Sequence, residues 1–233
     1  MNKILIFTAT YNEVDNIKIF LEKFLETNLI ADVLIIDDNS PDRTWEVVEH
    51  YQKTNKNFKL IKRENKEGLD TAHKLAFKYA IENNYDYLIT MDADLSHDPA
   101  KIVNFIKELD ESPFVIGSRY IKNGRNETKL SRYLLSYLGN KFIKLILNIN
   151  CDEFTTSYRG FNLKKLQNFS INNIKSKGYS FFMETVYRIH LHGYKIKEIP
   201  IIFKDRKKGF SKIPRVETLR TLKNLFLLKI NKI

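Results

Sequence analysis

The 233-residue sequence has a single cysteine (Cys151), only eight glycines and five prolines. One cysteine cannot form an internal disulfide, which fits a reducing compartment. No run of about 18 apolar residues occurs, so we expect no membrane-spanning helix, and the N-terminus lacks the features of a signal peptide. The length corresponds to one large domain or two small ones, and a hydrophobic content of 43% is enough for a sizeable core.

Two glycine-rich phosphate-binding signatures are also missing, because neither G-x-G-x-x-G nor G-x-x-x-x-G-K-[ST] is present. Acidic residues are outnumbered: 39 Lys and Arg against 28 Asp and Glu give a net charge of +11. This balance favours an anionic partner such as a phosphate, an acidic lipid or a nucleic acid. Without a glycine cradle, a bound phosphate would have to be neutralised by a metal ion and basic side chains.

The most informative stretch covers residues 88–99 and reads L-I-T-M-D-A-D-L-S-H-D-P. A buried strand ends here on Asp92 and Asp94, and Pro99 opens an amphipathic helical segment at residues 101–109. Open α/β sheets bind ligands at the carboxyl ends of their strands. Two carboxylates there could hold Mg²⁺ or Mn²⁺, with a diphosphate supplying further oxygens. The alternative for such a short motif is a turn in which aspartates cap the next helix.

Strand and helix patterns alternate through the first half of the chain. They predict strands at residues 4–8, 33–36, 58–61, 85–91 and 114–116, and helices at 14–25, 45–51, 69–81 and 101–109. This alternation predicts an α/β fold with a mostly parallel sheet and helices on both faces. Right-handed connections would place the carboxyl end of every strand on one edge. The polar residues expected to converge there are Glu13, Asp37, Asp38, Arg63, Lys66, Asp92, Asp94 and Arg119.

The second half of the chain is less regular. We predict helices at residues 130–147 and 181–191, a strand at 196–203 with an edge position suggested by Pro200, a basic loop around Gly209, and a closing helix at 216–230. Arg220, Lys223 and Lys229 lie among the apolar residues of the closing helix. Such a helix can lie flat on an anionic bilayer or pack on the domain with a solvated basic face, and both interpretations stay open.

In this order and spacing, the motifs resemble the family 2 glycosyltransferases with the nucleotide-sugar-binding GT-A fold, and among them the dolichyl- and polyprenyl-phosphate mannose synthases. The resemblance covers nearly the whole chain and is carried by T-Y-N-E at 10–13, D-D-N-S-P-D-R-T at 37–44, R-x-x-K-x-G at 63–68, D-A-D-L-S-H at 92–97, G-S-R at 117–119, R-x-x-x-S at 132–136, T-T-S-Y-R at 155–159 and R-x-x-G-x-S-K at 206–212. Four positions depart from the family pattern. Ala9 replaces Pro, Asp70 replaces Gly, and Ser96 replaces a Gln that can join the metal shell, while the family's T-S-G corresponds here to T-T-S at 155–157 or its neighbouring register, with a change at Ser157.

The resemblance implies an inverting transfer of a hexose to a polyprenyl phosphate, with GDP-mannose as the expected donor and Mg²⁺ or Mn²⁺ as cofactor. The nucleotide sugar would be held by Thr10, Tyr11, Glu13, Asp37, Asp38, Lys66 and Asp92, and the metal by Asp94 with Asp92 and Ser96. The acceptor phosphate would be bound by Arg119, Arg132, Ser136, Arg206 and Lys212, and the residues acting in catalysis would be Asp94, Arg119, Asp152, Arg206 and Lys212. We expect a catalytic domain at 1–213, with a nucleotide-sugar half at 1–120 and an acceptor half at 121–213, followed by the basic helix at 214–233.

The acceptor decides whether the enzyme needs a general base. A sugar hydroxyl must lose a proton to a carboxylate, whereas a phosphate monoester has a second pKa of about 6 and is mostly deprotonated at neutral pH. A polyprenyl-phosphate enzyme therefore needs cations rather than a base. Asp152 would be the base in a hydroxyl-acceptor enzyme, and otherwise would orient the sugar or the cations.

Several alternatives stay open at this point. In the same fold, the donor could be a UDP-sugar, or the acceptor a glycan hydroxyl. A basic nucleic-acid-binding protein would explain the charge but not the carboxylates that follow the strands, so we expect no nucleic-acid partner. The expected location is the cytoplasmic face of a membrane, reached through the closing helix or through a small membrane-protein partner.

Overall fold

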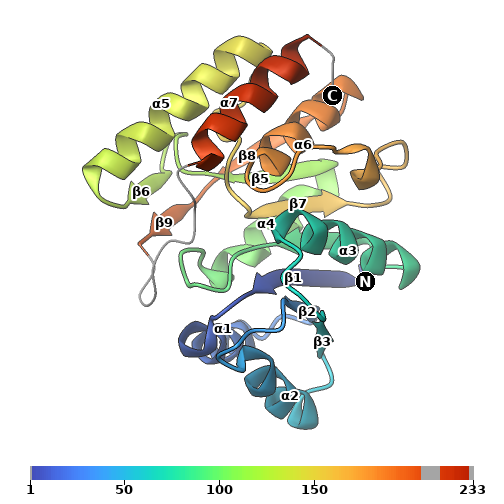
Figure 1. Ribbon diagram of the computed structural model, residues 1–233. Helices are drawn as coiled ribbons and strands as arrows, with labels where there is room; N and C mark the ends of the chain where they lie inside the picture. The colour runs from blue at the N-terminus through green and yellow to red at the C-terminus, as the bar shows by residue number, and fades with distance from the viewer. Residues whose placement is uncertain (1, 206–215, 231–233) are drawn as a thin grey trace.

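The computed structural model describes residues 2–205 and 216–230 (Figure 1). One seven-stranded sheet has the order β3-β2-β1-β4-β7-β5-β8, and a second sheet pairs β6 with β9. The strands are β1 (Ile4–Thr10), β2 (Asp32–Asp37), β3 (Phe58–Lys62), β4 (Tyr87–Thr90), β5 (Phe114–Ser118), β6 (Arg125–Glu127), β7 (Arg159–Asn162), β8 (Ile196–Pro200) and β9 (Ile202–Lys204). The predicted α/β class is therefore confirmed.

Helices cover both faces of the large sheet because successive strand residues point to opposite sides. Leu5 and Phe7 of β1 pack into a core that includes α3 (Leu69–Glu82), α5 (Leu130–Leu147), α6 (Ser180–Leu191) and α7 (Val216–Lys229). Ile6 between them packs into a second core with α1 (Val14–Glu26), α2 (Thr44–Thr54) and α4 (Ile102–Glu111). Two short 3-10 helices, Pro99–Lys101 and Ile171–Asn173, complete the described elements.

One strand runs against the others. β1, β2, β3 and β4 pair in parallel, as do β5 and β8, but β7 is antiparallel to both β4 and β5. The expectation that every strand would end on the same edge is therefore wrong for β7. Because β7 begins at that edge, the loop that precedes it, residues 152–158, lies among the carboxyl ends of its neighbours.

The predicted strand at 196–203 is two strands with a change of sheet between them. β8 forms the outer edge beside β5, as Pro200 suggested, and the chain leaves that sheet after Pro200 pairs with Ser118. Ile201 N–H then donates to Ser118 O at 3.0 Å, while Ile201 O accepts from Arg125 N at 2.9 Å. The first part of this segment, β8, therefore belongs to the large sheet, and the second part, β9, belongs to the small one.

The closing helix packs on the body of the protein. Leu225 and Leu228 of α7 are fully buried, and the Tyr187 hydroxyl of α6 donates to Leu228 O at 3.2 Å. Figure 1 shows α5 and α7 side by side at the top of the view, where the rings of Phe142 and Phe226 meet with centroids 6.5 Å apart. Within the described residues, no helix combines the length and apolar character needed to cross a bilayer.

Candidate active site at the carboxyl edge of the sheet

The strand order places three groups of polar residues along one edge. The turns after β3, β2 and β1 carry the residues predicted to bind nucleotide, and the turn after β4 carries Asp92 and Asp94. The loop at 152–158 and the end of β5, with Arg119, come next. The predicted residues therefore lie in a definite order along the edge. Those predicted to bind nucleotide are on one side, the two aspartates are in the middle, and the predicted acceptor residues are on the other side.

The turns after β1 and β2 are joined by Asp37. Its buried carboxylate accepts hydrogen bonds from the Thr10 hydroxyl at 2.6 Å and from the backbone and hydroxyl of Ser40 at 2.8 and 2.6 Å. The same Ser40 hydroxyl accepts from Asn12 N–H at 3.0 Å. Three donors satisfy Asp37, so its carboxylate holds the end of β1 and the turn after β2 together.

Asp38 is paired with Arg63, which follows β3. This buried ion pair is extended by hydrogen bonds from Arg63 to Thr71 Oγ1 at 2.6 Å and to Gly68 O at 3.1 Å. Farther along the same turn, the Lys66 ammonium lies 3.9 Å from the centre of the Tyr11 ring. The predicted residues Tyr11 and Lys66 are thus in contact, and the cation–π pair leaves a positive charge next to the β1 turn.

Asp92 and Asp94 occupy a tight turn just beyond β4. Asp94 is buried and accepts from Ser96 N–H at 3.0 Å, and Asp92 accepts from the Ser157 hydroxyl at 2.6 Å. Leu95 adopts a φ of 64°, a left-handed conformation that costs a leucine about 1 kcal/mol or more. Asp98 then caps the 3-10 helix that Pro99 opens, as predicted for that proline. Strain of this kind is concentrated at functional sites.

These two aspartates fit a metal site in which the protein supplies only some of the ligands and the substrate supplies the others. Within residues 2–205 and 216–230, no group of three or more His, Cys, Asp or Glu side chains could hold a metal ion by itself. Two carboxylates in one turn are the donor set expected for Mg²⁺ or Mn²⁺ when substrate phosphates supply the remaining oxygens. Ser96 is buried beside Asp94, and its carbonyl accepts from Lys204 N at 3.3 Å.

His97 was not among the predicted site residues, although it belongs to the D-A-D-L-S-H motif. Its buried ring accepts Asp92 N–H at Nδ1, 3.1 Å away, and meets Thr156 Oγ1 at 3.3 Å through Nε2. The ring also packs against Tyr158 and Phe203, with centroids at 4.9 and 5.4 Å. Burial lowers the pKa of His97 despite the carboxylates of Asp92 and Asp94 nearby, so the ring is neutral at pH 7.

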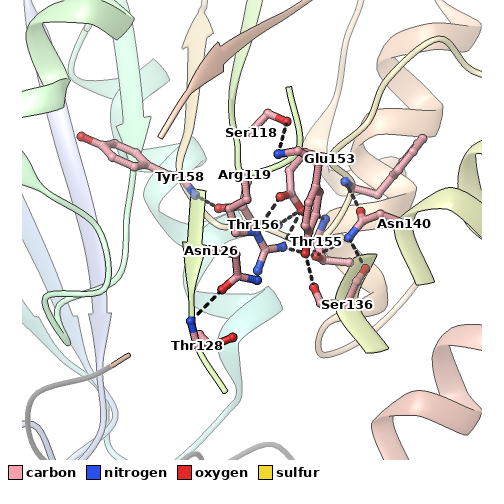
Figure 2. Close-up of polar contacts among 12 residues, drawn as sticks. Ser118, Arg119, Asn126, Thr128, Ser136, Asn140, Glu153, Thr155, Thr156 and Tyr158 are labelled. Atoms are coloured by element: carbon pink, nitrogen blue, oxygen red, sulfur yellow. Dashed lines mark hydrogen bonds and ion pairs between the residues drawn. The ribbon is translucent and has the colours of Figure 1, made fainter. Parts of the chain in front are cut away.

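The predicted acceptor cation Arg119 is held by a carboxylate that sequence reasoning missed (Figure 2). Its Nε and Nη2 donate to the two oxygens of Glu153, each at 2.7 Å, and Nη2 also donates to Thr155 Oγ1 at 2.8 Å. Glu153 is fully buried. Although burial acts to raise the pKa of Glu153, the Arg119 guanidinium and its hydrogen bonds hold that pKa below its ordinary value. Arg119 therefore presents an oriented, charge-compensated guanidinium.

The 152–158 loop that supplies Glu153 is fixed from two strands. The buried Arg159 at the start of β7 donates to Thr156 O, Phe154 O and Phe182 O, each at 2.8 Å, and burial lowers its pKa to about 9. From β4, the Thr90 hydroxyl donates to Ser157 O at 2.5 Å. The loop is therefore rigid enough to hold both Asp92, through Ser157, and Arg119, through Glu153.

The remaining predicted acceptor residues lie on or near α5. Ser136 accepts from the Tyr120 hydroxyl at 2.6 Å, next to Arg119, whereas Arg132 is partly exposed and pairs with Asp205 at 2.8 Å. Arg206 and Lys212 lie outside the described residues. Of the predicted acceptor set, the structure therefore brings Arg119 and Ser136 together and leaves Arg132 on the rim.

Asp152 is occupied by two lysines of α5. Its Oδ1 accepts from Lys141 at 2.8 Å and from Lys144 at 3.0 Å, and its N–H donates to Glu198 at 2.9 Å. Partial burial acts to raise the pKa of Asp152, but the hydrogen bonds from the two lysines bring it below its ordinary value. A carboxylate with a lowered pKa is a poor general base near neutral pH.

Comparisons with known proteins point to one enzyme family. The model of Glycosyl transferase family 2 matches residues 5–169. An undecaprenyl-phosphate mannosyltransferase of Micrococcus luteus is 31% identical over 212 residues, 91% of this chain and 87% of the relative. A polyprenol monophosphomannose synthase of Mycolicibacterium smegmatis is 28% identical over 212 residues, 90% of this chain and 80% of the relative.

Solved structures match over almost the full chain. Glucosyl-3-phosphoglycerate synthase from Mycobacterium tuberculosis, in complex with Mn²⁺, uridine diphosphate and phosphoglyceric acid, has a TM-score of 0.70 at 11% identity, over 99% of this chain and 78% of that chain. Mannosyltransferase PcManGT from Pyrobaculum calidifontis, in complex with GDP-Man and Mn²⁺, has a TM-score of 0.61 at 15% identity, over 99% of this chain but only 64% of that longer one. The family match and the relatives identify the protein as a glycosyltransferase, and the solved structures give it the GT-A fold. The chain belongs to glycosyl transferase family 2.

Proposed function

We propose that this enzyme transfers mannose from GDP-mannose to a polyprenyl phosphate, with inversion and with a divalent cation. The observation that carries the proposal is the similarity to two curated relatives named for mannosyl transfer to, or mannose on, a polyprenyl phosphate, each over at least 90% of this chain. The geometry of the site supports both halves of the reaction. The residues proposed to bind the nucleotide lie on one side of the two central aspartates, and those proposed to bind the acceptor lie on the other. We call these two sides the nucleotide wall and the acceptor wall.

The acceptor wall favours a phosphate over a sugar hydroxyl. A hydroxyl acceptor would need a base, and Asp152, the carboxylate considered for that role, is paired with two lysines and has a lowered pKa. A phosphate needs cations instead. Arg119 and Ser136 provide a guanidinium and a hydroxyl near one another, linked through Tyr120. Arg132, Arg206 and Lys212 complete the proposed acceptor-binding set.

In the proposed reaction, Tyr11, Glu13 and Lys66 hold the nucleotide, while Asp37 and Asp38 fix the turns that carry them. Asp94 and Asp92 would hold Mg²⁺ or Mn²⁺, which offsets charge on the departing diphosphate. Arg119 orients the acceptor phosphate so that its oxygen attacks the anomeric carbon in line with the leaving group. The phosphate is already ionised, so no protein group needs to remove a proton.

We also propose that the protein works on the cytoplasmic surface of a membrane. The outer face of α5 and α7 supports this, because it exposes large apolar side chains: Leu130, Leu134, Leu135, Leu138, Phe142 and Leu145 on α5, and Leu219, Leu222 and Phe226 on α7. Exposed basic side chains accompany them, among them Lys129, Lys141, Arg220 and Lys223. Apolar insertion with flanking positive charge is the pattern of helices that lie on anionic lipid.

The test is a donor panel. The protein is incubated with Mg²⁺ or Mn²⁺, a short polyprenyl phosphate and one radiolabelled nucleotide sugar at a time, and label is counted in the organic phase. We expect label from GDP-mannose and its loss with a chelator. Lipid label from a UDP-sugar alone would overturn the donor. Label that appears only on an added glycan would overturn the acceptor and return Asp152 to the role of base.

A further inference from the structure

His97 lies buried between the Asp92–Asp94 turn and the 152–158 loop, and it contacts both. Toward the nucleotide side, its Nδ1 accepts the backbone N–H of Asp92 at 3.1 Å. Toward the acceptor side, its Nε2 meets the Thr156 hydroxyl at 3.3 Å. The ring is 1% exposed and is enclosed by Tyr158 and Phe203. A side chain so enclosed can meet a ligand only through the groups that it contacts.

The two contacts fix the hydrogen positions on the ring. A backbone N–H can only donate, so Nδ1 must carry a lone pair, and the ring proton is then on Nε2. Nε2–H therefore donates to Thr156 Oγ1, which also accepts from Tyr158 N–H at 3.2 Å. The ring thus accepts a hydrogen bond from the Asp92–Asp94 turn and donates one to the 152–158 loop.

Thr156 leads directly to the acceptor cation. Its backbone N–H donates to Glu153 Oε1 at 3.2 Å, the same oxygen that accepts from Arg119 Nη2 at 2.7 Å. Figure 2 shows Thr156, Thr155, Glu153 and Arg119 gathered in this cluster. A continuous chain of hydrogen bonds therefore runs from Asp92 through His97, Thr156 and Glu153 to Arg119.

We propose that His97 is a positioning residue that sets the spacing between the Asp92–Asp94 turn and the loop that orients Arg119. Its Nδ1 contact fixes the turn, and its Nε2 contact fixes the loop. The two effects are separable, because asparagine places an acceptor where Nδ1 is and glutamine places a donor where Nε2 is. The consequence for catalysis rests on the proposed function, but the positioning itself does not.

The positioning is tested by amide hydrogen exchange, which needs no substrate. In His97→Asn, we expect the Asp92 amide to keep its protection while amides 153–157 exchange about 10-fold faster, the effect of one lost hydrogen bond. In His97→Gln, we expect the reverse, and in His97→Ala both regions should exchange faster. Equal exchange in the Asn and Gln variants would overturn the inference, whether or not the enzyme transfers mannose.

The functional consequence is tested by separating the two substrates. His97→Asn should keep the affinity for GDP with Mn²⁺ and raise KM for the lipid phosphate about 10-fold, and His97→Gln should weaken GDP binding about 10-fold at unchanged acceptor KM. Thr156→Val should reproduce the Asn variant and add nothing to it in the double variant. If exchange separates the variants and no lipid label forms in wild type, the proposed function fails and the positioning stands. If lipid label forms but the Asn and Gln variants change the GDP affinity and the acceptor KM alike, the positioning has no role in catalysis.

A second buried histidine supplies the matched control. His73 is also buried, among Phe7, Phe181 and Phe182 in the core. His73→Asn and His73→Gln introduce the same amides into a buried site and should lower stability without separating donor affinity from acceptor KM. Thr185→Val is the control for the loss of a buried threonine hydroxyl, which in this case donates to Phe181 O at 2.8 Å. If a His73 variant separated donor affinity from acceptor KM, burial of an amide rather than the His97 contacts would be the cause. If Thr185→Val did so, loss of a buried hydroxyl would explain the Thr156→Val result.

Discussion

The carboxylates at the edge of the sheet differ in what satisfies them. Asp37 accepts three hydrogen bonds, Asp38 and Glu153 each pair with an arginine, and Asp152 pairs with two lysines. Asp94 is buried in a turn strained at Leu95, with a backbone N–H from Ser96 on one oxygen. A buried carboxylate in the turn that carries the D-A-D motif suits a divalent cation that arrives with the substrate phosphates. We therefore propose Asp94, rather than any of these other four carboxylates, as the principal metal ligand.

We therefore predict that Asp94→Asn lowers kcat by at least about 1,000-fold, because a bound cation contributes several kcal/mol to charge stabilisation. The measurement is lipid-linked label per unit time at saturating donor and Mn²⁺. The matched control is Asp86→Asn at the opposite end of the β4 region, where the carboxylate pairs with Lys164 and should leave kcat within about 3-fold. Full activity in Asp94→Asn would exclude Asp94 as a ligand.

Glu153 makes a second residue-scale prediction. Glu153→Gln leaves the Arg119 charge without its buried counter-charge, and removing one partner of a buried ion pair costs about 3 kcal/mol. We expect that loss in the free energy of unfolding, measured with urea, together with a raised KM for the lipid phosphate because Arg119 loses its fixed orientation. Glu82→Gln removes a carboxylate from the exposed pair with Lys78 and should cost less than about 0.5 kcal/mol. Equal losses in the two variants would contradict the buried role of Glu153.

Much of the site could be predicted at this scale, and the rest has a physical reason for being hidden. Asp37, Asp92 and Asp94 lie at or just beyond the ends of strands, so the parallel pattern alone placed them on one edge. Glu153, Thr156 and Ser157 act through partners such as Arg119 and Asp92, which lie 34 to 65 residues away in the chain. Nothing local in a polar loop reveals such pairs. The available signal was the position of these residues inside or next to a motif of the family.

At the scale of elements, periodicity identified the long segments. The helix predicted at 130–147 has those bounds, and the apolar strands of the first half lie within a few residues of their predicted ranges. β7 was missed because its four residues, R-G-F-N, show neither alternation nor an apolar run. Its place in the sheet comes from tertiary pairing with β4 and β5. The missed strand is also the one that brings the 152–158 loop to the site.

The structure also enlarges the surface that we propose for membrane contact. Sequence periodicity pointed to the closing helix alone, but α7 buries Leu225 and Leu228 in the core and shares its outer face with α5. We predict that Leu135→Glu with Leu138→Glu on α5 reduces binding to vesicles containing anionic lipid about 100-fold, since each buried leucine contributes about 1.5 kcal/mol or more. Flotation measures the bound fraction, and activity toward a water-soluble short-chain acceptor should be unchanged.

The chain offers a matched control for this face. Ile30 and Val103 are exposed elsewhere on the protein, and Ile30→Glu with Val103→Glu adds the same charges. Flotation of this variant should equal that of wild type. Equal loss in both double variants would attribute binding to net charge alone. Binding to neutral vesicles as strong as to anionic ones, or a dimer that only the α5 variant abolishes, would assign the face to another partner.

At the scale of the whole molecule, one buried histidine links the fold to pH. His73 of α3 sits in the core between the sheet and α6, where burial, assisted by the charge of Arg159, lowers its pKa to about 3. In the unfolded chain, a histidine has a pKa of about 6.5. Between these values the unfolded state binds a proton that the folded state does not, so stability falls as the pH falls.

We predict that His73 alone lowers the free energy of unfolding by about 2 kcal/mol between pH 7 and pH 5. His73→Phe should remove this part of the pH-dependent decrease. Phenylalanine suits the site because the imidazole already packs edge to face on Phe7 and Phe182. Urea unfolding of both proteins at pH 7, 6 and 5 measures the difference, which should grow as the pH falls because only the wild type carries the titrating group. His50→Phe is the control at an exposed position on α2, and its pH dependence should match that of wild type. A wild-type curve parallel to that of His73→Phe across this range would mean that His73 is protonated within the fold, and the core around it would then have to hold a charge.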